Sequence, residues 1–163
     1  MVNIVVGERN QGKTTRLIKI YEKINKGDGF VSVKRMKNGN IIGYDAIQLS
    51  NREKYPFIIR EDYLFYNRDF DNWDNGVSLG PYRFSNKTFN IIEYKIEDML
   101  KKRISPIFLD EIGLLEIKNC GFDKIFRKIL LEANEIYIAT RDKFVHKVIK
   151  KYSIKQINIL KLE

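Results

Sequence analysis

The chain has 163 residues, of which 44% are hydrophobic and 31% are charged. This composition suits a globular chain that buries one sizeable core, and the length predicts a single domain over residues 1–163. No run approaches the roughly 20 consecutive apolar residues of a membrane-spanning helix, so we expect a cytoplasmic protein without a membrane partner. The single cysteine, Cys120, excludes an intrachain disulfide and a zinc site built from several cysteines.

The formal net charge of +9 suits anionic partners, which include free nucleotides as well as nucleic acids. The densest basic stretch lies near the end of the chain on a predicted helix, and it comprises Arg141, Lys143, Lys147, Lys150, Lys151 and Lys155. A solvated helix face explains this pattern better than a nucleic-acid surface. Nucleic acid is therefore a less favoured partner, and the composition carries no signal for the oligomeric state.

In chain order, the first predicted strand covers residues 2–6, and a glycine-containing loop follows it directly. Residues 7–14 match the pattern G-x-x-x-x-G-K-[ST], and apolar residues then recur at helical spacing over 14–26. The N–H groups of such a loop, at the N-terminus of a helix, form a cradle for phosphate. We predict that the phosphates of a nucleoside triphosphate bind to Gly7, Glu8, Arg9, Asn10, Gln11, Gly12, Lys13, Thr14 and Thr15.

The middle of the chain has the alternating pattern of extended strands. Residues 30–33 alternate, Asn38-Gly39 is a hairpin signal, and extended patterns resume over 41–49 and 76–84. We expect these strands to add an antiparallel meander to a sheet. The segment between these extended patterns is rich in aromatic residues that alternate with acids: Tyr63, Phe65, Tyr66, Phe70 and Trp73. Because the acids would repel a nucleic-acid backbone, this segment favours a lid or cover over the sheet more than a surface for stacking bases.

Helix and strand signals alternate in the second half of the chain. A capping-box-like pair, Asn90 and Glu93, opens a predicted helix that runs to about Arg103. It is followed by a strand over 106–109, a helix over 121–132, a strand over 135–140, the basic helix and a strand near 154–160. This alternation predicts an α/β P-loop NTPase fold: a mostly parallel central sheet flanked by helices, with the antiparallel meander added.

The strand over 106–109 ends in two acids, Asp110 and Glu111. In a parallel sheet of this kind, the carboxyl end of the strand lies beside the phosphate loop. We therefore expect Thr14 and Asp110 to hold Mg²⁺, Lys13 to reach the β- and γ-phosphates, and Glu111 to orient or deprotonate an attacking water. Arg141 follows another strand and is a candidate for an arginine that reaches the transferred phosphoryl group, with a surface arginine as the alternative.

Four segments together resemble the THEP-type nucleoside-triphosphatases, small P-loop proteins that are also described as predicted nucleotide kinases. They are residues 12–15, residues 38–45, Gly80-Pro81-Tyr82, and above all residues 109–116 with the sequence Leu-Asp-Glu-Ile-Gly-Leu-Leu-Glu. The resemblance covers most of the chain and implies Mg²⁺-dependent hydrolysis of ATP, GTP and other nucleoside triphosphates to diphosphates. The charged loop interior over residues 8–11 departs from the family's usual pattern.

Two other functions are consistent with the same residues. A nucleotide or small-molecule kinase would use the same loop and Mg²⁺ to pass the phosphoryl group to an acceptor held by the middle of the chain. A nucleic-acid-dependent ATPase, or a nucleotide-binding switch, would use the basic surface. Phosphate release without an acceptor separates the first alternative from hydrolysis, and stimulation by RNA or DNA identifies the second.

Overall fold

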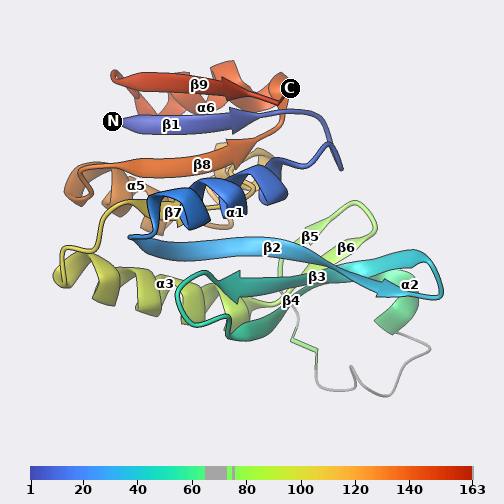
Figure 1. Cartoon of the computed structure of the whole chain (residues 1–163). Helices are drawn as coiled ribbons and strands as arrows, with labels where there is room; N and C mark the ends of the chain where they lie inside the picture. Colours follow the sequence, from blue (N-terminus) through green and yellow to red (C-terminus); the bar gives the residue numbers. More distant parts are fainter. Residues whose placement is uncertain (65–72, 75, 163) are drawn as a thin grey trace.

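A computed structural model describes residues 1–64, 73–74 and 76–162, and within them nine strands form one mixed sheet in the order β5-β6-β4-β3-β2-β7-β8-β1-β9 (Figure 1). The strands are β1 (Val2–Val6), β2 (Asp28–Lys37), β3 (Asn40–Gln48), β4 (Lys54–Arg60), β5 (Ser78–Leu79), β6 (Tyr82–Phe84), β7 (Ile107–Leu109), β8 (Ile136–Thr140) and β9 (Ile157–Lys161). The helical elements are α1 (Lys13–Ile24), α2 (Glu61–Leu64), α3 (Asn86–Lys101), α4 (Leu114–Ile117), α5 (Asp123–Glu132), the 3₁₀ turn η2 (Asp142–Phe144) and α6 (Val145–Tyr152).

The sheet has a parallel half and an antiparallel half. Strands β2, β7, β8, β1 and β9 are parallel neighbours, whereas β3, β4, β6 and β5 continue the sheet from β2 with antiparallel pairing. This arrangement confirms the predicted α/β fold with a mostly parallel core and an added meander. Because β7 and β1 flank β8 and all three are parallel, the segments that follow them emerge at the same edge of the sheet.

Helices cover both faces of the sheet. On one face, Leu17 of α1 is fully buried and packs in a cluster with Val5 and Phe108. On the other face, helices α3, α5 and α6 contribute Ile92, Phe126 and other buried side chains to a larger core (Figure 1). The apolar runs of the parallel strands are therefore buried from both sides, as expected for strands at the centre of such a sheet.

Helix α3 begins earlier than predicted. Its N-cap is Ser85, whose hydroxyl accepts the Thr88 N–H at 3.1 Å, and the Asp74 carboxylate accepts the Asn86 N–H at 2.8 Å. The prediction that Asn90 opens this helix was wrong, because Asn90 lies one turn inside it. The orphan N–H groups of the first turn are satisfied by Ser85 and by an acid that is distant in the sequence.

Strand β4 was not predicted, and the predicted aromatic cover falls largely outside the described residues. Pro56 interrupts the strand signal, but it pairs with Asp45 next to a β-bulge in β4, where a missing N–H is tolerated. Phe65, Tyr66 and Phe70 lie outside the described residues, so the cover stays a prediction. Within the described part of the chain, no helix combines the length and apolar character required to cross a membrane.

Candidate active site

The loop between β1 and α1 has the shape of a phosphate cradle. Gly12 adopts a left-handed conformation with φ of 95°, which glycine tolerates without strain, and it precedes the first residue of α1. At Gly7 the Leu162 side chain packs close to the backbone, so that an added Cβ atom would lie 2.4 Å from it. The Gln11 side chain accepts the Glu8 N–H at 2.6 Å, which fixes the interior of the loop. The loop therefore presents the N-terminus of α1 at the sheet edge.

Lys13 is buried, with an exposed fraction of 3%, although lysine is rarely found in the interior. Its Nζ donates to the Glu8 carbonyl oxygen at 2.8 Å and lies 3.7 Å from a carboxylate oxygen of Glu111. The ammonium group is thus held inside the loop and faces the acid that follows β7. This places a fixed positive charge where a bound phosphate would meet the Glu111 carboxylate.

Asp110 joins the loop to β7. Its Oδ2 accepts the Thr14 hydroxyl at 2.6 Å and the Ser32 N–H at 3.1 Å. Its Oδ1 is buried and has no hydrogen-bond partner among the described residues. Burial, together with the nearby Glu111 carboxylate, raises the pKa of Asp110 to about 7. A buried carboxylate with one unpaired oxygen beside a hydroxyl is a suitable site for a cation.

The donor set at this point fits Mg²⁺. Mg²⁺ prefers oxygen ligands, and it commonly uses one or two protein groups together with substrate phosphates and waters. Thr14 and Asp110 supply such a pair, and a bound cation would satisfy the unpaired Oδ1. Among the described residues, no three or more acidic, histidine or cysteine side chains are grouped so that they could hold a metal ion.

Glu111 has an unusual backbone for a residue that is not glycine. Its φ is 59°, in the left-handed region that side chains other than glycine adopt infrequently. The residues on either side are anchored: the Asp110 N–H donates to Phe30 at 3.1 Å, and the Ile112 N–H donates to Ala139 at 2.9 Å. The Glu111 side chain is 43% exposed, so solvent and ligands reach its carboxylate.

A cavity of about 690 Å³ contains most of these groups. The predicted residues that line it are Arg9, Asn10, Gly12, Lys13, Thr14, Thr15, Glu111 and Arg141, whereas Gly7, Glu8 and Gln11 shape the loop and Asp110 is buried behind it. Its far wall comes from the antiparallel half of the sheet and the adjoining helices, and includes Tyr44, Phe57, Tyr82, Phe84, Phe89 and Phe122. The cavity therefore has a cationic, polar end and an aromatic end.

A family model described as NTPase, NTPase_1, matches residues 3–163. The chain belongs to the THEP1-type NTPase family. The crystal structure of THEP1 from the hyperthermophile Aquifex aeolicus is similar, with a TM-score of 0.67, 21% sequence identity, and coverage of 99% of this chain and 90% of that chain. At this identity the structural likeness shows a shared fold. No curated protein sequence matches the chain. Membership of the family implies hydrolysis of nucleoside triphosphates.

Sequence reasoning missed two tyrosines that line the cavity, Tyr44 and Tyr82. Arg9 donates to the Tyr82 hydroxyl, and its guanidinium lies 4.9 Å from the centre of the Tyr82 ring. Tyr44 packs edge-on against Tyr82 with ring centres 6.1 Å apart. Strands β3 and β6 thus bring two side chains against the charged interior of the phosphate loop. The segment Gly80-Pro81-Tyr82 was part of the family resemblance, but nothing in it indicated this contact.

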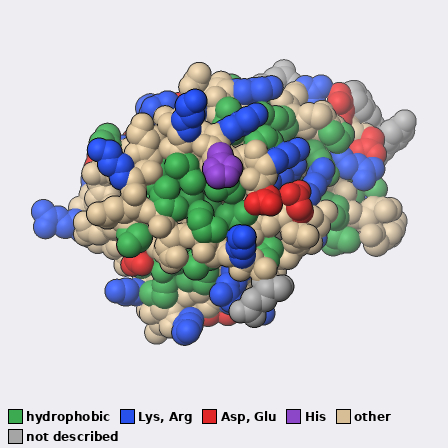
Figure 2. Space-filling view, turned by 90° about the horizontal axis from the view of Figure 1, so that it is seen from above, with side chains coloured by type: hydrophobic (Ala, Val, Ile, Leu, Met, Phe, Trp, Pro, Cys, Tyr) green, Lys and Arg blue, Asp and Glu red, His purple; other side chains and the backbone are tan. Residues whose placement is uncertain are grey.

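The basic residues near the end of the chain do not all point to solvent. Lys147 and Lys150 on α6 are exposed, as predicted for a solvated face, whereas Lys151 turns inward. Figure 2 shows lysine and arginine side chains spread over the face around His146, with hydrophobic and uncharged surface between them. This distribution agrees with a solvated helix better than with a nucleic-acid surface.

Proposed function

We propose that the chain is a Mg²⁺-dependent nucleoside-triphosphatase that converts ATP, GTP and other nucleoside triphosphates to diphosphate and phosphate, with residues 1–163 acting as one domain. One observation carries the proposal: a buried amine, a hydroxyl–carboxylate pair and an accessible carboxylate converge at one end of the cavity. These groups are Lys13, Thr14 with Asp110, and Glu111. Family membership supports hydrolysis as the reaction.

Binding begins with the phosphates. The N–H groups of the loop and of the first turn of α1 donate to phosphate oxygens, and the helix N-terminus adds a partial positive charge. Lys13 has three N–H donors, of which the Glu8 carbonyl takes one, so donors remain for the β- and γ-phosphates. Thr15 lies one residue further along the helix and donates to the α-phosphate.

Thr14 and Asp110 hold the metal ion in this proposal. The Thr14 hydroxyl already lies 2.6 Å from Asp110, so both oxygens are preorganised on the same side of the loop. A Mg²⁺ ion held there would neutralise charge on the phosphate oxygens and so favour attack at the γ-phosphorus. The Ser32 N–H holds the Asp110 carboxylate in this orientation from the neighbouring strand.

Glu111 accepts the proton of the attacking water. The water oxygen forms a bond to the γ-phosphorus as the bond from that phosphorus to the bridging oxygen breaks, and the nucleoside diphosphate leaves with the electron pair. Lys13 stabilises the charge that develops on the transferred group. Arg141 is half-buried on the cavity wall, and we assign it a supporting contact to the same group.

The decisive variant is Glu111→Gln. It keeps the size of the side chain and removes the base, so we expect turnover to fall by about two orders of magnitude or more while Mg·ATP binding stays. Phosphate release from ATP, GTP, CTP and UTP measures turnover, and Glu132→Gln, an exposed acid on α5, is the matched control. A Glu111→Gln protein with full turnover would show that Glu111 is not the base. Phosphate release by the wild-type protein no faster than the rate without enzyme would contradict the enzyme assignment.

The aromatic end of the cavity favours one alternative, a kinase. Phe57 lies against Phe89 with ring centres 4.9 Å apart, and Phe89 lies 4.9 Å from Phe122, which gives an apolar wall that water as a substrate does not require. Such a wall suits an acceptor molecule with an aromatic group. Nucleosides and nucleoside monophosphates added to the phosphate-release assay test this. Phosphorylated acceptor, with faster ATP consumption, would favour the kinase, whereas unchanged phosphate release would favour hydrolysis.

A further inference from the structure

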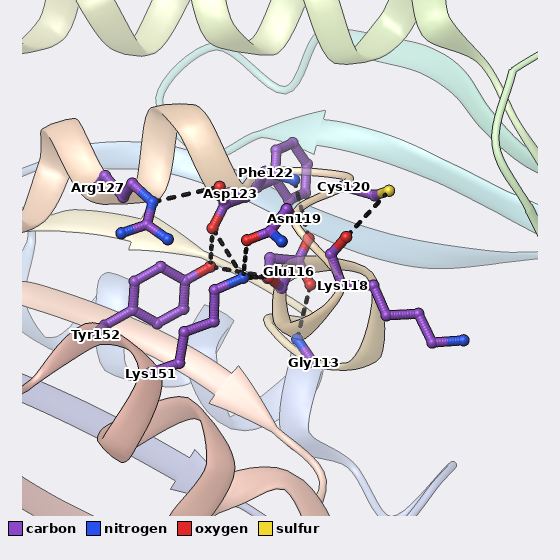
Figure 3. Close-up of polar contacts among 10 residues, drawn as sticks. All are labelled: Gly113, Glu116, Lys118, Asn119, Cys120, Phe122, Asp123, Arg127, Lys151 and Tyr152. Atoms are coloured by element: carbon purple, nitrogen blue, oxygen red, sulfur yellow. Dashed lines mark hydrogen bonds and ion pairs between the residues drawn. The ribbon is translucent and has the colours of Figure 1, made fainter.

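Glu116 is a buried carboxylate that the proposed chemistry does not use. Its exposed fraction is 2%, and burial raises the pKa of its carboxyl group. Each of its oxygens accepts one backbone N–H: Oε2 from Gly113 at 2.8 Å and Oε1 from Phe122 at 2.9 Å (Figure 3). Burying a carboxylate is costly unless its oxygens are satisfied, and here both oxygens are taken up by the backbone.

The Gly113 contact lies two residues beyond Glu111. Within this segment, Asp110 and Ile112 are anchored by backbone hydrogen bonds to β2 and β8, and Gly113 is anchored by Glu116. Glu111 stands between these anchors with its left-handed φ of 59°. Such a conformation persists only where the surrounding structure enforces it. On the C-terminal side of Glu111, the Glu116 carboxylate is the side chain that holds this backbone in place, through the Gly113 N–H.

The carboxylate is itself held rigidly by the turn that follows α4. Gly121 allows the turn to approach, since a Cβ atom there would lie 2.4 Å from Glu116 Oε1. Lys151 of α6 donates to the Glu116 backbone oxygen and to Asn119 at 2.8 Å, and it pairs with Asp123 at 3.2 Å (Figure 3). Contacts from α5 and α6 therefore fix the segment from which Glu116 reaches Gly113.

We propose that Glu116 is a positioning residue, which through the Gly113 N–H keeps Glu111 in its left-handed conformation with the carboxylate beside Lys13. The inference rests on the proposed function, in which Glu111 is the base. A carboxylate suits the role because it accepts two N–H groups at once. A glutamine in its place would offer one accepting oxygen and would turn an NH₂ group toward the other N–H.

A double-mutant cycle tests this inference with the variants Glu116→Gln, Glu111→Gln and the two combined. In the wild-type background, we expect Glu116→Gln to lower kcat about 10- to 100-fold through misplacement of the base, with KM for ATP unchanged. In the Glu111→Gln background, Glu116→Gln should have no further effect, because the base is already absent. A purely structural role, such as a cap for α4, would lower kcat equally in both backgrounds and would overturn the inference.

Lys128→Met is the control, since it removes an ion pair of α5 with Glu97 of α3, at 3.3 Å, and leaves the contacts of Glu116 intact. We expect an unchanged kcat; a loss of kcat equal to that of Glu116→Gln would overturn the inference. If Glu116→Gln does not fold, Glu116→Asp replaces it, because the shorter carboxylate cannot reach both N–H groups. Wild-type kcat in Glu116→Asp would then overturn the inference.

Failure of the inference and failure of the proposed function give different results. Full turnover in the Glu111→Gln protein would show that Glu111 is not the base, and the positioning role of Glu116 would then fail as well. Loss of turnover in Glu111→Gln together with full turnover in folded Glu116→Gln would leave the base in place and remove only the positioning role.

Discussion

Replacing Lys13 with methionine is expected to separate nucleotide binding from the stability of the fold. Methionine keeps the apolar stem that fills the loop, and it removes the ammonium group that donates to Glu8 and faces Glu111. A hydrogen bond to a charged group contributes about 1.5–3 kcal/mol, and about 1.4 kcal/mol is a tenfold change in affinity. Loss of one such bond to phosphate should therefore raise the Kd for Mg·ATP about 10- to 150-fold.

Displacement of a fluorescent ATP analogue at saturating Mg²⁺ measures this Kd, and thermal unfolding of the nucleotide-free protein measures stability. Lys19→Met is the matched control, because Lys19 is exposed on the same helix and should leave the Kd unchanged. A Kd for Lys13→Met within a factor of about two of wild type would refute the role of Lys13. An equal loss in Lys19→Met would show that the effect is one of general charge.

Three further predictions concern the metal pair and the core. Asp110 has a pKa raised from 3.8 to about 7, so its protonation favours the folded state. The unfolding free energy of the metal-free protein should therefore fall as the pH rises from about 4 to about 7, and it should fall less in Asp110→Asn. Urea unfolding at both pH values checks this, and an equal fall in the two proteins would contradict it. Thr14→Val should raise the Mg²⁺ concentration for half-maximal turnover about tenfold or more, whereas Thr14→Ser, which keeps the hydroxyl, should stay close to wild type. Phe126 is fully buried with its ring centre 4.8 Å from that of Tyr152, so Phe126→Ala should lower the unfolding free energy by about 3–5 kcal/mol in urea unfolding. Leu131 is 86% exposed, so Leu131→Ala should lower it by less than about 0.5 kcal/mol; similar losses would contradict the core assignment.

The parts of the site that could be predicted follow from local sequence and one topological rule. The phosphate loop is contiguous, so its glycines and Lys13 are recognisable from spacing alone. Asp110 lies 96 residues from Thr14, yet its approach was expected because parallel strands end at one edge of the sheet. Both inferences depend on patterns of a few adjacent residues, and the structure brings these residues within hydrogen-bond distance.

Contacts that depend on the pairing of strands distant in the sequence could not be predicted from such local patterns. The Ser32 N–H reaches Asp110 because β2 pairs with β7, and Tyr82 meets Arg9 because β6 pairs with β4. Helix α3 was misplaced for a similar reason, since the Asp74 side chain that helps to cap it is outside the helix. The capping-box spacing at Asn90 was locally plausible, but the Ser85 hydroxyl and the Asp74 carboxylate cap the helix one turn earlier.

The two halves of the sheet divide the cavity between them. The parallel half supplies Lys13, Thr14, Asp110 and Glu111, whereas the antiparallel half supplies the aromatic wall around Phe57. Backbone pairing between β2 and β3 joins the halves. Because the phosphate-binding groups come from the parallel half, substitutions on the meander side of the cavity are the natural way to change the choice of ligand while the phosphate chemistry keeps its geometry.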